Sequence, residues 1–250
     1  MLTPAASSDP RRDAFSELKL RLQGARGAAA IAIDSCLSSG FPDLDRILGG
    51  GFPRGALVTL EGSRSSGRWS IVAALLAAAT GRGLGAVIDQ GELYPPALAA
   101  AGVRLERLLV IPARTPLGIA RAADILLRSR VVTLIVMPAS SLRAAVWARL
   151  AGLAHKAGAL LVVIATRASA ELAASAGMRL GCALARVALY GTRGVWCTFA
   201  GFTVRAELRK HKRLAPGANA CISIAVSADG VVVRERAVDR PRMRAVAGER

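Results

Sequence analysis

Residues 56–79 read ALVTLEGSRSSGRWSIVAALLAAA, and this stretch decides the fold. It opens with the apolar run ALVTL, which is typical of a buried strand, and it ends with IVAALLAAA, which favours a helix. The residues between them, GSRSSGR, are small, polar and glycine-containing. A strand that passes through such a turn into a helix presents backbone N–H groups and the positive end of the helix dipole to an anion. The stretch therefore predicts the architecture of a phosphate-binding loop.

The glycines of this loop match the nucleotide-binding pattern G-x-x-x-x-G-K-[ST], but the residues after them do not. Gly62 and Gly67 have the required spacing. Arg68 stands in place of the lysine that contacts phosphates, and Trp69 stands in place of the hydroxyl residue that binds Mg²⁺. The planar guanidinium of arginine needs a different geometry from the ammonium of lysine. We expect no bound cofactor and at most weak binding of ATP or phosphate, through Gly62, Ser65, Ser66, Gly67, Arg68 and Ser70.

Short apolar runs alternate with helical stretches from residue 28 onward. Strands are expected at 56–60, 85–89, 108–112, 131–137, 159–165 and 186–190, and helices at 69–80, 95–101, 116–128, 141–157 and 169–178. Several of these strands are continuous apolar runs, as required of a parallel sheet covered by helices on both faces. The pattern predicts an α/β, doubly wound domain. Further strands without long helices indicate an antiparallel C-terminal extension of the sheet, at 195–199, 202–208, 220–227 and 230–233.

The two ends of the chain differ from this core. Residues 9–23 predict a short amphipathic N-terminal helix, with Phe15, Leu18 and Leu22 on one face, and GARGAA follows as a linker. The last segment is basic, contains proline and lacks apolar periodicity, so a loose tail is expected. The predicted organisation is a helix and linker at 1–27, a core domain at 28–233 and a basic tail at 234–250.

Composition narrows the choice of partners. The 250 residues carry a net charge of +17, which favours polyanions such as nucleic acid. Only four of the 34 basic residues are lysines, so the arginine excess also fits a bias in base composition, and both explanations stay open. The scattered cysteines and two histidines predict buried thiols and no metal site. Without a long apolar run or a signal-peptide pattern, we expect a cytoplasmic protein with no membrane partner.

The order of the motifs resembles the core of the RecA recombinase family. Residues 38–55, SSGFPDLDRILGGGFPRG, look like the family's segment before the phosphate loop, and GSRSSGRWS is similar to its G-P-E-S-S-G-K-T-T. IDQGELYPPALAAAGVRLERLLV resembles the next strand and the D-A-E-H-A-L-D-P segment, and LRKHKRLAP is similar to V-K-N-K-I-A-A-P. The matches keep their order from residue 38 to residue 224. The resemblance implies a mostly parallel RecA-like sheet of the P-loop NTPase type.

The departures from the family fall on its catalytic positions. The family's catalytic glutamate falls on Gly91, with Glu92 one place later, and Met137 and Pro138 stand where an aspartate should end the strand TLIVM. Thr166 stands where the family uses a glutamine to sense the γ-phosphate. Phosphoryl transfer depends on positioning and electrostatic stabilisation, and losing one such group costs on the order of 10² to 10³ in rate. We therefore expect no catalytic residues and no ATP hydrolysis.

Two groups of basic residues remain as candidates for contacts with other molecules. The family's first DNA-binding loop has no counterpart here, and the second is reduced to a segment within 167–182, where Arg167 and Arg179 are candidate DNA contacts. In RecA filaments the lysines equivalent to Lys210 and Lys212 reach the ATP phosphates of the neighbouring subunit. The resemblance therefore implies phosphate contacts across an interface for these two lysines. A solvated basic turn is the alternative explanation.

A RecA-like core with altered catalytic positions, a short N-terminal helix and a basic tail resemble the ImuA group of proteins. The resemblance implies a non-catalytic DNA-repair accessory protein that supports damage-induced translesion synthesis, or SOS mutagenesis. Its implied partners are a RecA-type recombinase and a Y-family-like polymerase homologue at the nucleoid, with single-stranded DNA as a further candidate. Two alternatives stay open: an unorthodox DNA-dependent ATPase that uses Arg68, Ser70 and Glu92, and a sequence-independent DNA-binding module that uses the arginine surface and the tail.

Overall fold

The computed structural model describes residues 36–192, 196–226 and 232–233. The helix expected at 9–23, its linker and the basic tail at 234–250 lie outside the described residues. The limits of those segments therefore stay predictions. Among the helices that the structure describes, none combines the length and the apolar character that a membrane span requires.

The described elements alternate between strands and helices, as the apolar pattern predicts. The strands are β1 (Cys36–Leu37), β2 (Phe52–Pro53), β3 (Leu57–Glu61), β4 (Leu84–Asp89), β5 (Leu108–Pro112), β6 (Val132–Pro138), β7 (Leu160–Ala165), β8 (Met178–Thr192), β9 (Trp196–His211), β10 (Asn219–Val226) and β11 (Val232–Val233). The helices are α2 (Pro42–Ile47), α3 (Arg68–Arg82), α4 (Pro95–Ala100), the 3₁₀ helix η2 (Leu105–Arg107), α5 (Pro116–Ser129), α6 (Ala144–Ala157) and α7 (Ala170–Ser175).

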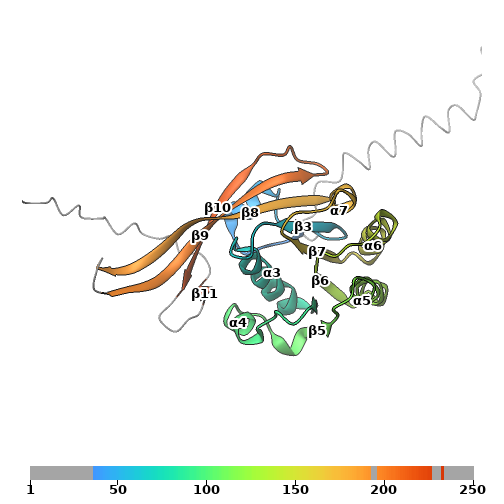
Figure 1. Cartoon of the computed structure of the whole chain (residues 1–250), viewed down its shortest axis with the longest axis horizontal. Coiled ribbons are helices and arrows are strands. Elements are labelled where there is room, and N and C mark those ends of the chain that lie inside the picture. Colours follow the sequence, from blue (N-terminus) through green and yellow to red (C-terminus); the bar gives the residue numbers. More distant parts are fainter. Residues whose placement is uncertain (1–35, 193–195, 227–231, 234–250) are drawn as a thin grey trace, which may run out of the picture. The chain divides into compact units, whose positions relative to one another are not determined.

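One large sheet organises the molecule (Figure 1). Its strand order is β11-β10-β9-β8-β3-β7-β6-β4-β5, while β1 and β2 form a separate two-stranded sheet. The pairs from β5 to β8 are parallel, and the pairs from β8 to β11 are antiparallel. The expected doubly wound, mostly parallel sheet with an antiparallel C-terminal extension is thus confirmed.

Helices cover both faces of the parallel part, which explains its continuous apolar strands. Helices α2, α3 and α4 contribute to one buried cluster, and α5, α6 and α7 contribute to the other. Successive residues of β6 join the two clusters in turn: Leu134 and Val136 belong to the first, and Ile135 and Met137 belong to the second. The parallel part of the sheet therefore separates two buried cores.

The antiparallel part differs from the sequence prediction in its boundaries. The helix expected at 169–178 ends at Ser175, and the strand expected at 186–190 is the outer part of β8, which begins at Met178. The two strands expected at 195–199 and 202–208 are the single strand β9. They looked separate because Gly201 interrupts the apolar pattern. A Cβ atom at Gly201 would lie 2.2 Å from the carbonyl oxygen of Ile224, so glycine is needed where β10 packs closely.

Candidate functional site

The predicted loop joins β3 to α3 and contains two glycines, Gly62 and Gly67, at positions where neighbouring strands leave no room for a side chain. Gly67 caps α3 in the left-handed region (φ 81°), and Gly62 also has a positive φ (155°). A Cβ atom would lie 2.1 Å from Val204 Cγ2 at Gly67 and 2.3 Å from the Cys182 carbonyl oxygen at Gly62. Strands β8 and β9 thus press directly on the loop. The strand, turn and helix start of a phosphate-binding loop are present as predicted.

The loop borders a cavity of about 620 Å³ at the carboxyl ends of β4, β6 and β7. This edge of an open α/β sheet is where such folds bind ligands. Arg64, Arg68 and Trp69 line the cavity from the loop side, and Glu92 and Thr166 line it from the ends of β4 and β7. Of the other predicted loop residues, Ser70 lines a neighbouring apolar cavity of about 250 Å³, while Ser66 is buried and Ser65 is exposed.

Arg68, which replaces the phosphate-binding lysine, is buried and contacts the protein itself. Its side chain is 6% exposed, and Nη1 donates a hydrogen bond to the carbonyl oxygen of Ala165 at the end of β7. The backbone N–H of Gly62 donates to the same oxygen over 3.1 Å. Burial lowers the pKa of the Arg68 guanidinium. Arg68 therefore ties the loop and α3 to β7, which is a structural role that the sequence pattern did not predict.

The other altered positions lie where the resemblance predicts, around the same cavity. Met137 is fully buried, Pro138 ends β6, and the exposed carboxylate of Glu92 forms an ion pair with Arg64. The Asp89 carboxylate accepts hydrogen bonds from the backbone N–H groups that follow it in the turn. Within the described part of the chain, no group of three or more histidine, cysteine, aspartate or glutamate residues could hold a metal ion.

These donors do not fit a magnesium nucleotide of the kind that the fold family binds. Trp69 supplies no hydroxyl oxygen, and the end of β6 supplies no carboxylate. Two buried polar atoms of the loop, the Ser66 hydroxyl and Arg68 Nε, have no hydrogen-bond partner among the described residues. The carboxylates that line the cavity are those of Asp89, which ends β4, and Glu92, which follows it.

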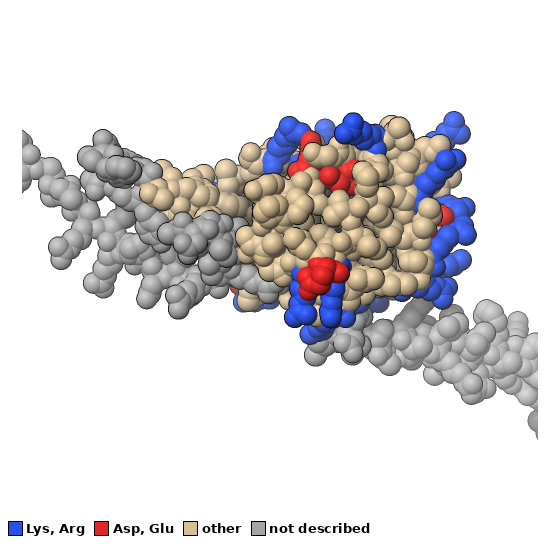
Figure 2. All heavy atoms as spheres, turned by 90° about the horizontal axis from the view of Figure 1, so that it is seen from below, with Lys and Arg blue, Asp and Glu red and all other residues tan. Residues whose placement is uncertain are grey.

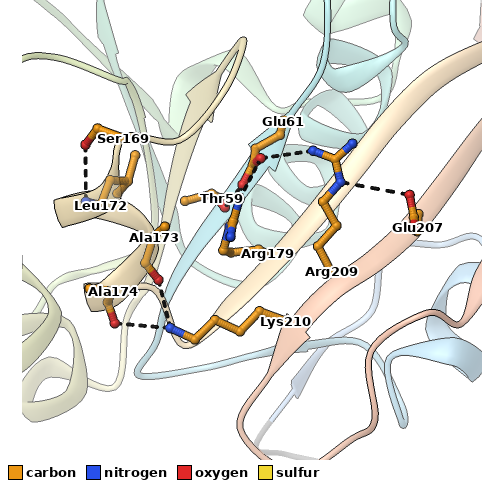
Figure 3. Close-up of polar contacts among 10 residues, drawn as sticks. All are labelled: Thr59, Glu61, Ser169, Leu172, Ala173, Ala174, Arg179, Glu207, Arg209 and Lys210. Carbon is orange, nitrogen blue, oxygen red and sulfur yellow. Dashed lines mark hydrogen bonds and ion pairs between the residues drawn. The ribbon is translucent and has the colours of Figure 1, made fainter.

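A buried carboxylate anchors the base of the loop (Figure 3). Glu61, the last residue of β3, is fully buried and accepts hydrogen bonds from Arg179 over 2.7 and 3.0 Å. Arg209 and the Thr59 hydroxyl donate to it over 3.0 and 3.1 Å. Burial alone would raise the pKa of the Glu61 carboxyl, but these donors and the charge of Arg179 lower that pKa overall. The cluster of Glu61, Arg179 and Arg209 fastens β8 and β9 to β3.

The two candidate DNA contacts do not lie together in a shortened loop. The segment 167–182 holds α7 and the start of β8, and loop residues within it are confined to 167–169 and 176–177. Arg179 lies in β8 and forms a two-bond ion pair with Glu61, while Arg167 is exposed after β7. The pair with Glu61 also raises the pKa of Arg179. Of the two arginines, Arg167 has the side chain that is open to solvent.

The two candidate interface lysines differ in their surroundings. Lys210 is the residue before the end of β9 and donates from Nζ to the carbonyl oxygens of Ala173 and Ala174, over 2.7 and 3.1 Å (Figure 3). These carbonyls belong to the end of α7, where a cation is favourable because of the helix dipole. Burial and the nearby positive charges lower the pKa of Lys210. Lys212 is exposed in the turn after β9. Lys212 is therefore the more exposed of the two, while Lys210 is partly buried and held by two backbone carbonyls.

The sequence analysis missed the roles of Glu61 and Arg209. The sequence offered one signal for Glu61. It is an isolated acidic residue directly before the loop, in a chain with twice as many basic as acidic residues. The expectation of buried thiols is confirmed for Cys182, whose pKa burial raises to about 12, and it is wrong for Cys221, which is exposed. Cys221 looked buried because β10 alternates apolar residues, yet it occupies the outward position between Ala220 and Ile222.

Comparison with known proteins agrees with this geometry. The RecA protein of Picosynechococcus sp. strain PCC 7002 is 37% identical over 113 residues, which cover 44% of this chain and 32% of that protein. RecA of Prochlorococcus marinus strain SARG is 36% identical over 103 residues, covering 40% of this chain and 27% of that protein. The chain thus matches about a third of the length of these relatives. The crystal structure of the RadB recombinase covers 78% of this chain and 97% of its own, with a TM-score of 0.60 and 18% identity.

The fold, together with these sequence matches, defines the class: the chain is a homologue of RecA with a RecA-like α/β core. More particularly, the family model of the MT3502 N-terminal domain matches residues 46–170, from α2 to the start of α7. The chain belongs to this family.

Proposed function

We propose that this protein is a non-catalytic, RecA-like accessory protein of DNA repair, which supports damage-induced translesion synthesis as members of the ImuA group do. It acts through contacts with a RecA-type recombinase and a Y-family-like polymerase homologue. ATP hydrolysis has no part in this role.

The observation that carries the proposal is the position of Arg68. The residue that should meet the phosphates is buried and donates to the Ala165 carbonyl oxygen, and the neighbouring catalytic positions hold Trp69, Met137 and Pro138. Several parts that act together in phosphoryl transfer have thus been replaced by residues that serve packing. In the RecA-like core around them, β3, β4, β6 and β7 remain largely buried. Altered catalytic positions in a retained core favour a protein that uses its fold to bind other proteins.

The mechanism that we propose for the recombinase contact uses the end of β9. The chain docks at one end of a RecA filament and presents Lys212, with Lys210 beside it, to the phosphates of the terminal ATP. Lys212 is exposed and needs no rearrangement. Lys210 would exchange its two α7 carbonyls for phosphate oxygens, and its lowered pKa reflects the burial that it would leave.

The test is binding of the purified chain to preformed RecA filaments that contain a slowly hydrolysed ATP analogue. The double variant Lys210→Ala with Lys212→Ala should weaken binding by tenfold or more, which corresponds to about 1.4 kcal/mol. Lys156→Ala removes an exposed lysine on α6 and serves as the matched control with unchanged binding. Equal affinity of the double variant and the parent chain would contradict the lysine mechanism.

A second candidate function is sequence-independent DNA binding. The observation that favours it is the surface in Figure 2, where lysine and arginine side chains form several groups around the body and acidic side chains are fewer. Arg167 is one exposed arginine at the strand ends. This function predicts binding to single-stranded DNA that falls steeply with salt and needs no RecA. Filament binding that persists at moderate salt without free DNA favours the accessory role instead.

A further inference from the structure

The apolar face of the antiparallel strands continues beyond the core. Across β8 and β9, Leu184 pairs with Val204, Val187 with Phe202, and Leu189 with Phe199. Val204 is fully buried, whereas the outer residues Leu184, Val187, Leu189 and Phe199 are 44, 48, 59 and 45% exposed. Phe199 stacks on Phe202 with ring centroids 6.2 Å apart. We call these four exposed residues the outer apolar face; large exposed patches of this kind mark interaction sites.

No helix of the described chain lies beside this part of the sheet. Figure 1 shows β8 and β9 running past α3 and away from the body, and in Figure 2 the same projection is almost entirely tan. The side chains between the apolar ones lie on the opposite face, because successive residues of a strand alternate. Among them are Arg186 and, on β9, Thr203 and Arg205. The projection is therefore apolar on one face and carries Arg186 and Arg205 on the other.

The outer edge of β8 is open for strand pairing. Strand β3 pairs with β8 only from Met178 to Gly181, so among the described residues the part beyond Gly181 has β9 on one side alone. A register shift between Leu184 and Arg186 separates this outer part, residues 186–190, from the part beside β3. It contains no proline and a single charge. Unprotected edges of this kind readily accept a further strand.

Charge indicates what kind of strand fits. Neither Arg186 nor Arg205 forms an ion pair with a described residue, and both are exposed. A second copy of this chain would bring the same arginines and another net charge of +17. Like charges at an interface oppose association, whereas complementary charges favour it. An acidic partner matches the surface better than a second copy does.

We propose that the outer part of β8 binds an extended acidic segment of a partner protein, which joins the sheet as an added strand beside residues 186–190. Apolar residues at alternate positions of this segment cover the outer apolar face, and the carboxylates between them meet Arg186. Backbone hydrogen bonds supply affinity in this binding mode, and the alternating side chains supply specificity. The surface is one site for the protein contacts on which the proposed function rests, but it involves neither the phosphate loop nor Lys212.

The test uses the full chain and a fluorescent synthetic peptide of alternating valine and glutamate, followed by fluorescence anisotropy. Leu189→Lys and Arg186→Glu should each weaken binding about tenfold or more. The control Leu117→Lys changes a leucine of equal exposure on α5, 59% for both residues, and the control Arg121→Glu makes the same charge change on that helix. A peptide with lysine in place of glutamate should not bind. Hydrogen exchange of the amides at 186–190 should slow when the glutamate peptide is bound.

Three results would overturn the proposal. They are absence of saturable peptide binding, equal weakening by the α5 controls, and binding without slower exchange at 186–190. Dimerisation of the free chain that Leu189→Lys abolishes would assign the surface to a second copy instead. Because the assay contains neither RecA nor ATP, failure here leaves the filament contact standing, and failure of the filament contact leaves this surface standing.

Discussion

Arg68 illustrates how one residue can keep a fold while changing its chemistry. A lysine in this position would be free to reach an anion in the cavity, whereas the longer guanidinium reaches the Ala165 carbonyl and is 6% exposed. The sequence predicted that the substitution weakens phosphate contacts. It could not predict the new partner, because Ala165 is 97 residues away along the chain and meets Arg68 only through the packing of β3 beside β7.

The first prediction concerns this contact. Arg68→Ala removes a buried hydrogen bond and leaves a void, so it should lower the free energy of unfolding by about 1 to 3 kcal/mol. Arg64→Ala removes an arginine of the same loop that is 84% exposed and should change stability by less than about 0.5 kcal/mol. Urea denaturation of both variants checks the difference. Equal stability of the two would show that the Arg68 contact contributes nothing.

The second prediction concerns the pH dependence of the Glu61 cluster. The pKa of Glu61 in the folded chain lies below its ordinary value of 4.5, so its stabilisation is complete above that pH and is lost as the pH falls through the lowered value. Glu61→Gln should cost about 2 kcal/mol at pH 7, moderated by the partial exposure of Arg209. This cost should shrink in acid.

Unfolding measured against pH for both chains isolates the contribution of Glu61. The comparison is needed because the hydrogen bond from Arg149 also lowers the pKa of Asp124, so other acids contribute to the slope of each curve. A difference between the two chains that stays constant from pH 7 down to pH 3 would contradict the assignment.

At the scale of elements, α3 and β8 to β10 show where sequence patterns succeed and where they fail. The apolar periodicity of α3 and the unbroken runs of the parallel strands were readable because two cores bury them. The full lengths of β8 and β9 could not be predicted, because their outer halves extend beyond the core and Gly201 interrupts the apolar pattern of β9. The apolar run at 108–112 predicted β5 correctly although this edge strand is mostly exposed, so the failures at β8 and β9 come from their interrupted patterns.

The third prediction compares two glycine substitutions. Gly67→Ala forces a Cβ atom toward Val204 in a left-handed conformation and should destabilise the chain by about 1 to 3 kcal/mol. Gly152→Ala lies within α6 with nothing within 4 Å of the added atom, so it should stabilise by about 0.5 to 1 kcal/mol. Thermal unfolding of the two variants gives the signs. Equal shifts of the unfolding temperature in the two variants would show that Val204 leaves room for a Cβ atom at Gly67.

At the scale of the whole molecule, the chain keeps the sheet order and packing of a RecA-like core while its cavity-lining groups have changed. The order of the motifs along the chain was enough to predict the sheet, because parallel strands joined by helices leave few topologies open. The position of the site could be predicted from the sequence, but the hydrogen-bond partners of its residues could not. Glu61 with Arg179 and Arg209, and Lys210 with the end of α7, depend on contacts between distant segments.

The most direct test of a non-catalytic role is ATP binding and turnover by the purified full chain with Mg²⁺, with and without single-stranded DNA and RecA. We expect at most weak binding and no turnover beyond that of RecA, because Arg68 donates to the Ala165 carbonyl oxygen and Trp69, Met137 and Pro138 occupy the positions of the family's magnesium ligands. Turnover by the chain alone that depends on Mg²⁺ and disappears in Arg68→Ala would contradict this expectation and identify an active ATPase.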